Sequence, residues 1–164
     1  MAGMFPTMVS DPNDRNRRFT GEVGPAWPKP LKIGYYLCLT AAVLMFVIAF
    51  LSMVADSPKD LDADVEGIFE RNLRVYTWGS IILGALITSC CAYLPKGSKV
   101  ARRWLAGFIG LAVFLQLASF FVGVAGWAAF VVVGVLVFAL FFMFRPAANA
   151  FVDKRSGDVW EGVE

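Results

Sequence analysis

The densest group of metal-ligating side chains in the sequence is a short acidic run that begins at Asp60. An EF-hand calcium loop places Gly at its sixth position and a bidentate Glu at its twelfth. Neither register, counted from Asp60 or from Asp62, supplies both of these residues. We therefore interpret Asp60, Asp62, Asp64 and Glu66 as a solvated acidic face, and as a candidate docking surface for a basic partner.

The soft metal-binding residues are three cysteines, Cys38, Cys90 and Cys91, and the chain contains no histidine. The absence of histidine excludes His-ligated haem, His-containing zinc sites and catalysis by an imidazole base. All three cysteines lie inside apolar runs without the spacing of a Cys/His metal motif. We interpret them as small packing residues. The sequence thus predicts no catalytic residue, no metal ligand and no cofactor, and we expect the protein not to be an enzyme.

The apolar runs contain few groups that could handle a polar substrate. Ion-coupled transporters place charged side chains at membrane depth, and the four apolar spans described below contain no Asp, Glu, Lys or Arg. The most polar side chain in them is Gln116. We predict that it makes one interhelical hydrogen bond, worth about 0.6–2 kcal/mol, rather than binding a substrate.

Small residues recur at helical spacing in two of the runs. Ser80, Gly84 and Thr88 follow one another every four residues, and Ala106 and Gly110 form a shorter series. Such stripes allow helix backbones to approach closely. The sequence leaves open whether they serve packing within this chain or packing against a neighbouring subunit.

The elements that carry these residues follow from composition. Of the 164 residues, 58% are hydrophobic and only 17% are charged, which is typical of a membrane protein. Residues 104–144 form an uncharged stretch of 41 residues. As one helix it would be about 60 Å long, twice the hydrocarbon core of about 30 Å, so it must fold back, at residues 123–126. We predict an all-α bundle of four transmembrane helices with short loops, spanning about residues 33–55, 75–94, 104–122 and 127–144.

Basic residues set the orientation of this bundle. The N-terminal segment, the second connection and the C-terminal tail hold twelve of the fifteen Lys and Arg residues. The first connection holds three basic residues against six acidic ones, a net charge of −3, and the third connection holds none. We therefore expect a multi-pass protein of the plasma membrane with both termini in the cytoplasm. Because the basic residues lie between apolar runs, the pattern does not indicate nucleic-acid binding.

Three segments lie outside the spans. Residues 1–30 are rich in proline and polar, so we expect an irregular cytoplasmic segment before the transmembrane domain of residues 31–146. Ser57 and Pro58 resemble a helix start, and apolar residues then recur at helical spacing. This predicts an amphipathic helix over about residues 58–72 on the outer surface. Residues 147–164 are expected to form a cytoplasmic tail.

Three short sequences flank the spans: Arg71-Asn72-Leu73-Arg74, Arg102-Arg103-Trp104-Leu105, and residues 144–151, which read FRPAANAF. With these flanks, residues 31–152 resemble small four-span membrane proteins of actinobacteria. Some of those proteins accompany the cytochrome bc–cytochrome oxidase supercomplex as accessory subunits without cofactors. The resemblance assigns no functional residue to this chain. It implies membrane lipids and haem-bearing respiratory subunits as partners.

Two functions from different classes follow from these observations. The first is a non-catalytic accessory subunit of a larger membrane complex, with the respiratory supercomplex as the expected complex. The second is a small cell-envelope membrane protein that handles lipid or assists a transporter or glycosyltransferase. A reactive polar cluster at one membrane face would favour the second function, and the residues nearest to that description are Arg71, Asn72 and Arg74.

Overall fold

The computed structural model describes residues 24, 26–54 and 63–157. In this part of the chain every regular element is helical, which confirms the all-α class. In chain order the elements are α1 (Lys29–Val54), α2 (Ala63–Cys91), the short 3-10 helix η1 (Leu94–Lys96), α3 (Lys99–Phe121), α4 (Ala128–Met143) and α5 (Pro146–Gly157).

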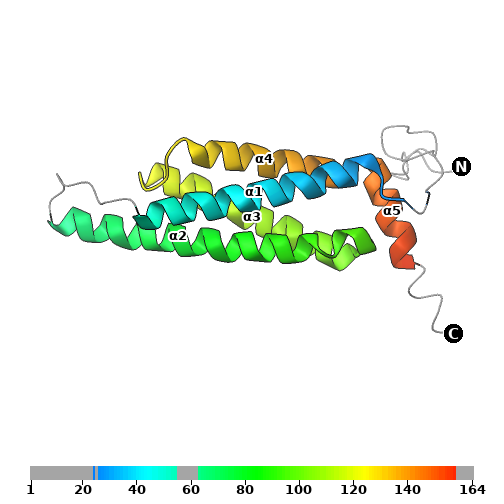
Figure 1. The fold of residues 1–164 in the computed structure, drawn as a ribbon, viewed down its shortest axis with the longest axis horizontal. Coiled ribbons are helices and arrows are strands. Elements are labelled where there is room, and N and C mark those ends of the chain that lie inside the picture. Colours follow the sequence, from blue (N-terminus) through cyan, green and yellow to red (C-terminus); the bar gives the residue numbers. More distant parts are fainter. Residues whose placement is uncertain (1–23, 25, 55–62, 158–164) are drawn as a thin grey trace, which may run out of the picture.

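Helices α1 to α4 run side by side in alternating directions, and α5 lies across one end of them (Figure 1). Each long helix packs against two neighbours: α1 contacts α2 and α4, and α3 contacts the same two helices. We call the end formed by η1, the start of α3 and α5 the α5 end. The opposite end, which holds the α3–α4 turn and the start of α2, is the hairpin end.

Three of the described helices are long and apolar enough to cross a membrane: α1, α2 with its continuation to Lys96, and α3. Helix α4 has 16 residues and meets the same criterion only together with α5, from which it is bent by 61°. By length and composition, the described residues therefore include three candidate spans, or up to four if the bent pair is counted as one.

The interior of the bundle contains two apolar clusters. The larger one brings together α1 to α5, and the smaller one lies toward the hairpin end around Tyr76, Ala125 and Ala129. Small residues allow the close approach of α1 to its neighbours. A Cβ on Gly34 would lie 2.8 Å from Met143 Cγ on α4, and a Cβ on Gly84 would lie 3.2 Å from the Phe46 ring.

The turn between α3 and α4 lies between Phe121 and Ala128, and it includes the predicted break at residues 123–126. Gly123 has φ +80°, in the left-handed region where side chains are strained. The carbonyl of Ser119 accepts two hydrogen bonds, from the backbone N–H groups of Val124 and Ala125 at 3.0 and 3.1 Å. These bonds satisfy a carbonyl that the end of the helix leaves without an intrahelical partner.

The structure places the predicted outer helix differently. From Ala63 onward it is the first part of α2 and continues into the span without interruption, and residues 58–62 lie outside the described residues. Its residues Asp64 to Ile68 are exposed. No helix-breaking proline separates the amphipathic pattern from the apolar one, so one helix accommodates both.

The described part of the predicted tail is also a packed element. Helix α5 covers most of it, and Ala148, Phe151 and Val152 are at most 1% exposed. Pro146 ends α4 because it has no N–H to donate to the preceding turn. Asn149 Nδ2 instead donates to the carbonyl of Phe144 at 3.1 Å. Three buried side chains among charged ones give too weak a pattern for the sequence to predict this helix.

Candidate functional site

The structure brings the predicted polar residues together at the interface of α2 and α3. The Tyr76 hydroxyl donates to Gln116 Oε1 at 3.0 Å, and both side chains are at most 1% exposed. This is an interhelical hydrogen bond made by the most polar side chain of the apolar runs. Two further buried atoms of the region, Gln116 Nε2 and Ser80 Oγ, have no hydrogen-bond partner among the described residues. The group carries no charge, so it can orient two helices but offers neither a base nor a charged ion ligand.

The two stripes of small residues lie in different surroundings. Ser80 and Gly84 are buried inside the bundle, whereas Thr88 is exposed and its hydroxyl donates to the Gly84 carbonyl at 2.8 Å. On α3, Ala106 is half-buried and Gly110 is exposed, with open space where its Cβ would stand. The α2 stripe therefore serves mainly internal packing, and the α3 stripe does not.

Sequence reasoning missed one member of the α3 stripe. Gly107 is exposed, and an added Cβ there would meet no atom within 4 Å. Gly107 and Gly110 lie three residues apart, so they share one face of the helix. That spacing was the available signal, but only the structure shows that the face is uncovered.

The predicted acidic docking surface is described in part. Asp60 and Asp62 lie outside the described residues, and Asp64 and Glu66 are exposed on the first turns of α2. No group of three or more His, Cys, Asp or Glu side chains that could hold a metal ion occurs in the part of the chain that the structure describes.

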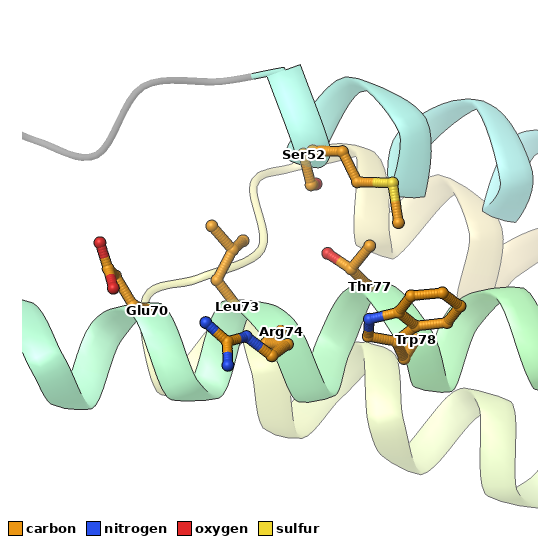
Figure 2. Close-up of a pocket in the computed structure, with 7 residues that line it drawn as sticks. Ser52, Glu70, Leu73, Arg74, Thr77 and Trp78 are labelled. Carbon is orange, nitrogen blue, oxygen red and sulfur yellow. The ribbon is translucent and has the colours of Figure 1, made fainter.

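A polar cavity of about 330 Å³ lies between the end of α1 and the outer turns of α2 (Figure 2). Leu73 and Thr77 point from α2 toward Ser52 on α1. The Ser52 hydroxyl donates to the Ile48 carbonyl at 2.9 Å. The cavity can hold a small polar group. Its lining residues are Ser52, Met53, Glu70, Leu73, Arg74, Thr77 and Trp78.

Of the three residues that the sequence offered as the nearest to a reactive polar cluster, only Arg74 lines this cavity. Arg71 is exposed and Asn72 is half-buried, and neither contributes to the lining. Glu70 lies one turn before Arg74 on the same helix, so the cavity presents both charge signs rather than a purely cationic surface.

A second polar cluster, which sequence reasoning did not identify, lies at the α5 end. The Arg102 guanidinium donates to Asn149 Oδ1 at 2.7 Å and stacks over the Phe144 ring at 4.9 Å. Lys99 Nζ lies 3.1 Å from an Asp153 carboxylate oxygen. These contacts join the start of α3 to α5. They stabilise the arrangement of helices, and Arg102 Nε is buried there without a hydrogen-bond partner among the described residues.

No protein-family model, no curated protein and no solved structure matches this chain. The functional proposal therefore rests on the geometry of this chain. In the described residues, that geometry consists of an uncharged buried pair, a mixed-charge cavity at the hairpin end, a polar contact between helices at the α5 end and an uncovered glycine face on α3.

Proposed function

We propose that this chain is a non-catalytic accessory subunit of a larger membrane complex, and that it crosses the membrane four times. The fourth span would be α4, which packs along α1 as extensively as α2 does. Residues 127–144 would rise about 27 Å as a helix, close to the hydrocarbon thickness of about 30 Å.

Charge supports a cytoplasmic location for the α5 end and for both termini. Lys96, Lys99, Arg103 and Arg145 lie at this end, whereas the first turns of α2 at the hairpin end carry Asp64, Glu66 and Glu70. Cytoplasmic flanks of bacterial spans are enriched in Lys and Arg. The proposed location is the plasma membrane.

We infer the accessory role from the uncovered face of α3 at Gly107 and Gly110. Glycine in a helix interior costs about 1 kcal/mol relative to alanine. No described residue occupies the space that these two glycines leave open. A helix of another subunit would use it, because small residues allow backbones in a membrane to approach closely.

The particular complex that we propose is the actinobacterial cytochrome bc–oxidase supercomplex. Support comes from the sequence resemblance of residues 31–152 and from the absence of histidine, since haem and copper would then be held by other subunits. Exposed Asp64 and Glu66 would contact a basic surface on the outer side of that complex.

The test is affinity purification of the tagged protein from its native membranes in mild detergent. Mass spectrometry and a reduced-minus-oxidised spectrum are expected to show stoichiometric haem-bearing bc and oxidase subunits. The Gly107→Leu/Gly110→Leu double variant is expected to lose them while remaining in the membrane. Gly134→Leu, which adds the same side chain on α4 where an added Cβ also meets open space, is the matched control and should keep them.

A second candidate function rests on the cavity at the hairpin end, where Arg74 and Trp78 lie at the level of the outer membrane surface in the proposed orientation. This geometry favours a cell-envelope protein that binds lipid or assists a transporter or glycosyltransferase. Recovery of the protein with envelope-lipid enzymes and no haem signal would establish that function and discard the respiratory assignment.

A further inference from the structure

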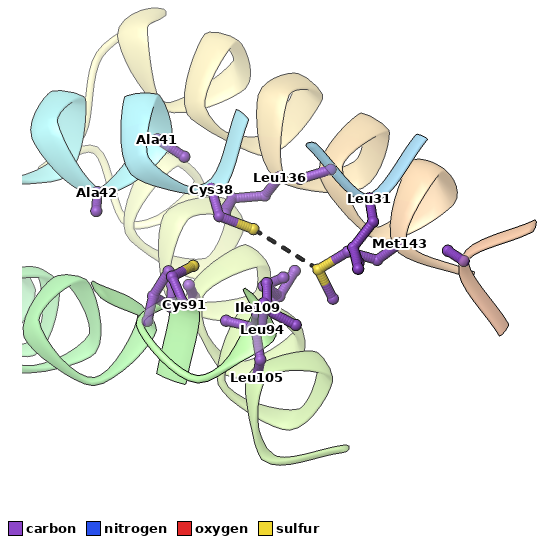
Figure 3. Packing of buried hydrophobic residues seen from close by; sticks show 14 of the residues in the cluster. Leu31, Cys38, Ala41, Ala42, Cys91, Leu94, Leu105, Ile109, Leu136 and Met143 are labelled. Carbon is purple, nitrogen blue, oxygen red and sulfur yellow. Dashed lines mark hydrogen bonds between the residues drawn. The ribbon is translucent and has the colours of Figure 1, made fainter. Parts of the chain in front are cut away.

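Three sulfur atoms from three different helices meet in the interior of the bundle (Figure 3). They belong to Cys38 on α1, Cys91 on α2 and Met143 on α4, and all three residues are 0% exposed. Cys38 Sγ lies 4.0 Å from Met143 Sδ, and the Cys91 side chain points into the same interior space beside Cys38. Both cysteines are free thiols.

The backbone holds these sulfur atoms in place. Met143 lies against Gly34, where an added Cβ would come within 2.8 Å of Met143 Cγ, so the close approach of α1 and α4 fixes this side chain. Cys91 is the last residue of α2 and lies just before the turn to η1. The surrounding side chains are apolar, among them Leu94, Leu105 and Ile109. The ligand atoms that this pocket offers are therefore sulfur atoms.

Thiolate and thioether ligands select soft metal ions, and Cu(I) is one of these. With metal–sulfur bonds of about 2.3 Å, a trigonal ion separates its sulfur ligands by about 4.0 Å. The distance between Cys38 Sγ and Met143 Sδ already has this value. Zn²⁺ by contrast takes four N, O or S ligands, and the cluster provides three.

We propose that Cys38, Cys91 and Met143 form a three-coordinate site for one Cu(I) ion per chain. Binding is not a redox step: copper enters and remains as Cu(I). The two thiols bind as thiolates, so two protons pass to solvent for each ion bound, and Met143 coordinates as a neutral thioether.

The experiment uses the purified, reduced full-length protein in detergent, titrated with Cu(I) in competition with a chromogenic Cu(I) chelator. The wild-type protein is expected to bind one equivalent with all-sulfur coordination in X-ray absorption, and to ignore Zn²⁺ at the same concentration. Loss of an outer-shell contact costs about 10–100-fold in metal affinity. Cys38→Ala, Cys91→Ala and Met143→Leu each remove a ligand, so each variant is expected to lose more Cu(I) affinity than that.

Cys90→Ala is the matched control, because Cys90 is half-buried beside Cys91 but is not one of the three clustered sulfur residues. It should bind Cu(I) like the wild type. Met143→Leu conserves the volume of the core, so it tests the site even if an alanine variant fails to fold. The proposal is overturned if the folded wild type binds no Cu(I), or if Cys90→Ala weakens binding as much as Cys91→Ala. None of these outcomes depends on whether the chain belongs to a respiratory complex.

Discussion

The two ends of the bundle contain the same kind of turn in different surroundings. Gly97 at the α5 end and Gly123 at the hairpin end both have positive φ, +72° and +80°. An added Cβ on Gly97 would lie 2.6 Å from Arg155 Cβ on α5, whereas one on Gly123 would meet no atom within 4 Å. Phe121 and Trp127, which flank the hairpin turn, are 83% and 78% exposed.

The difference shows that tertiary neighbours, not local backbone geometry, distinguish the two ends. At the α5 end a fifth helix covers the turn and contributes Phe151 and Val152 to the larger apolar cluster. At the hairpin end the aromatic side chains face outward, where the membrane interface suits amphipathic rings such as tryptophan. We infer that the α5 end fixes the arrangement of the helices and that the hairpin end presents surface to its surroundings.

The largest effect is expected from alanine at Gly97, with alanine at Gly123 as its comparison. Positive φ costs an L-residue about 1–2 kcal/mol, so Gly123→Ala should lower the free energy of unfolding by that amount. Gly97→Ala adds a steric conflict with α5, typically about 1–3 kcal/mol. Denaturant titration of both variants in mixed micelles measures the difference. Equal losses would show that α5 does not restrict the turn.

A smaller effect is expected when the polar contact at the α5 end is removed. Asn149→Ala leaves the Arg102 guanidinium without its 2.7 Å acceptor, and hydrogen bonds to charged groups are worth about 1.5–3 kcal/mol. The control is Asp153→Asn, which removes an ion pair whose side chains are 42% and 61% exposed. Exposed pairs contribute about 0–1 kcal/mol. The same titration should rank Asn149→Ala as clearly the more destabilising, and the opposite ranking would contradict this account of the α5 end.

The smallest effect is expected at the buried pair toward the hairpin end. Tyr76→Phe removes the donor to Gln116, and hydrogen bonds between membrane helices average about 0.6 kcal/mol with a maximum of about 1.7. Tyr36→Phe changes a ring that is 64% exposed and should leave the free energy of unfolding unchanged. A loss for Tyr76→Phe above that of Asn149→Ala would mean that the hairpin end, not the α5 end, dominates the stability.

Much of the architecture was predictable because apolar length and turn residues are local signals. The uncharged stretch of residues 104–144 required a reversal, and the structure has it between Phe121 and Ala128. The sequence also identified Gln116 as the residue to bond across helices. It did not identify Tyr76 as its partner, because a tyrosine near the end of a span equally suits the membrane interface.

The rest depended on contacts between residues far apart in the chain. The sequence suggested small packing residues on both α2 and α3, yet it could not show that Gly84 lies against Phe46 while Gly110 faces outward. The cluster of Cys38, Cys91 and Met143 had no spacing signal, because its members come from three helices.

The sequence by itself determined the helical class, the membrane-like composition and the position of the main reversals, because each depends on hydrophobicity and chain stiffness over a few turns. Only the tertiary structure decided which face of each helix is covered, that residues after Pro146 pack as α5, and which polar and sulfur atoms meet. The physical reason is that helices nearly uniform in apolarity carry no pattern that fixes their rotation. Side-chain packing between helices sets that rotation instead.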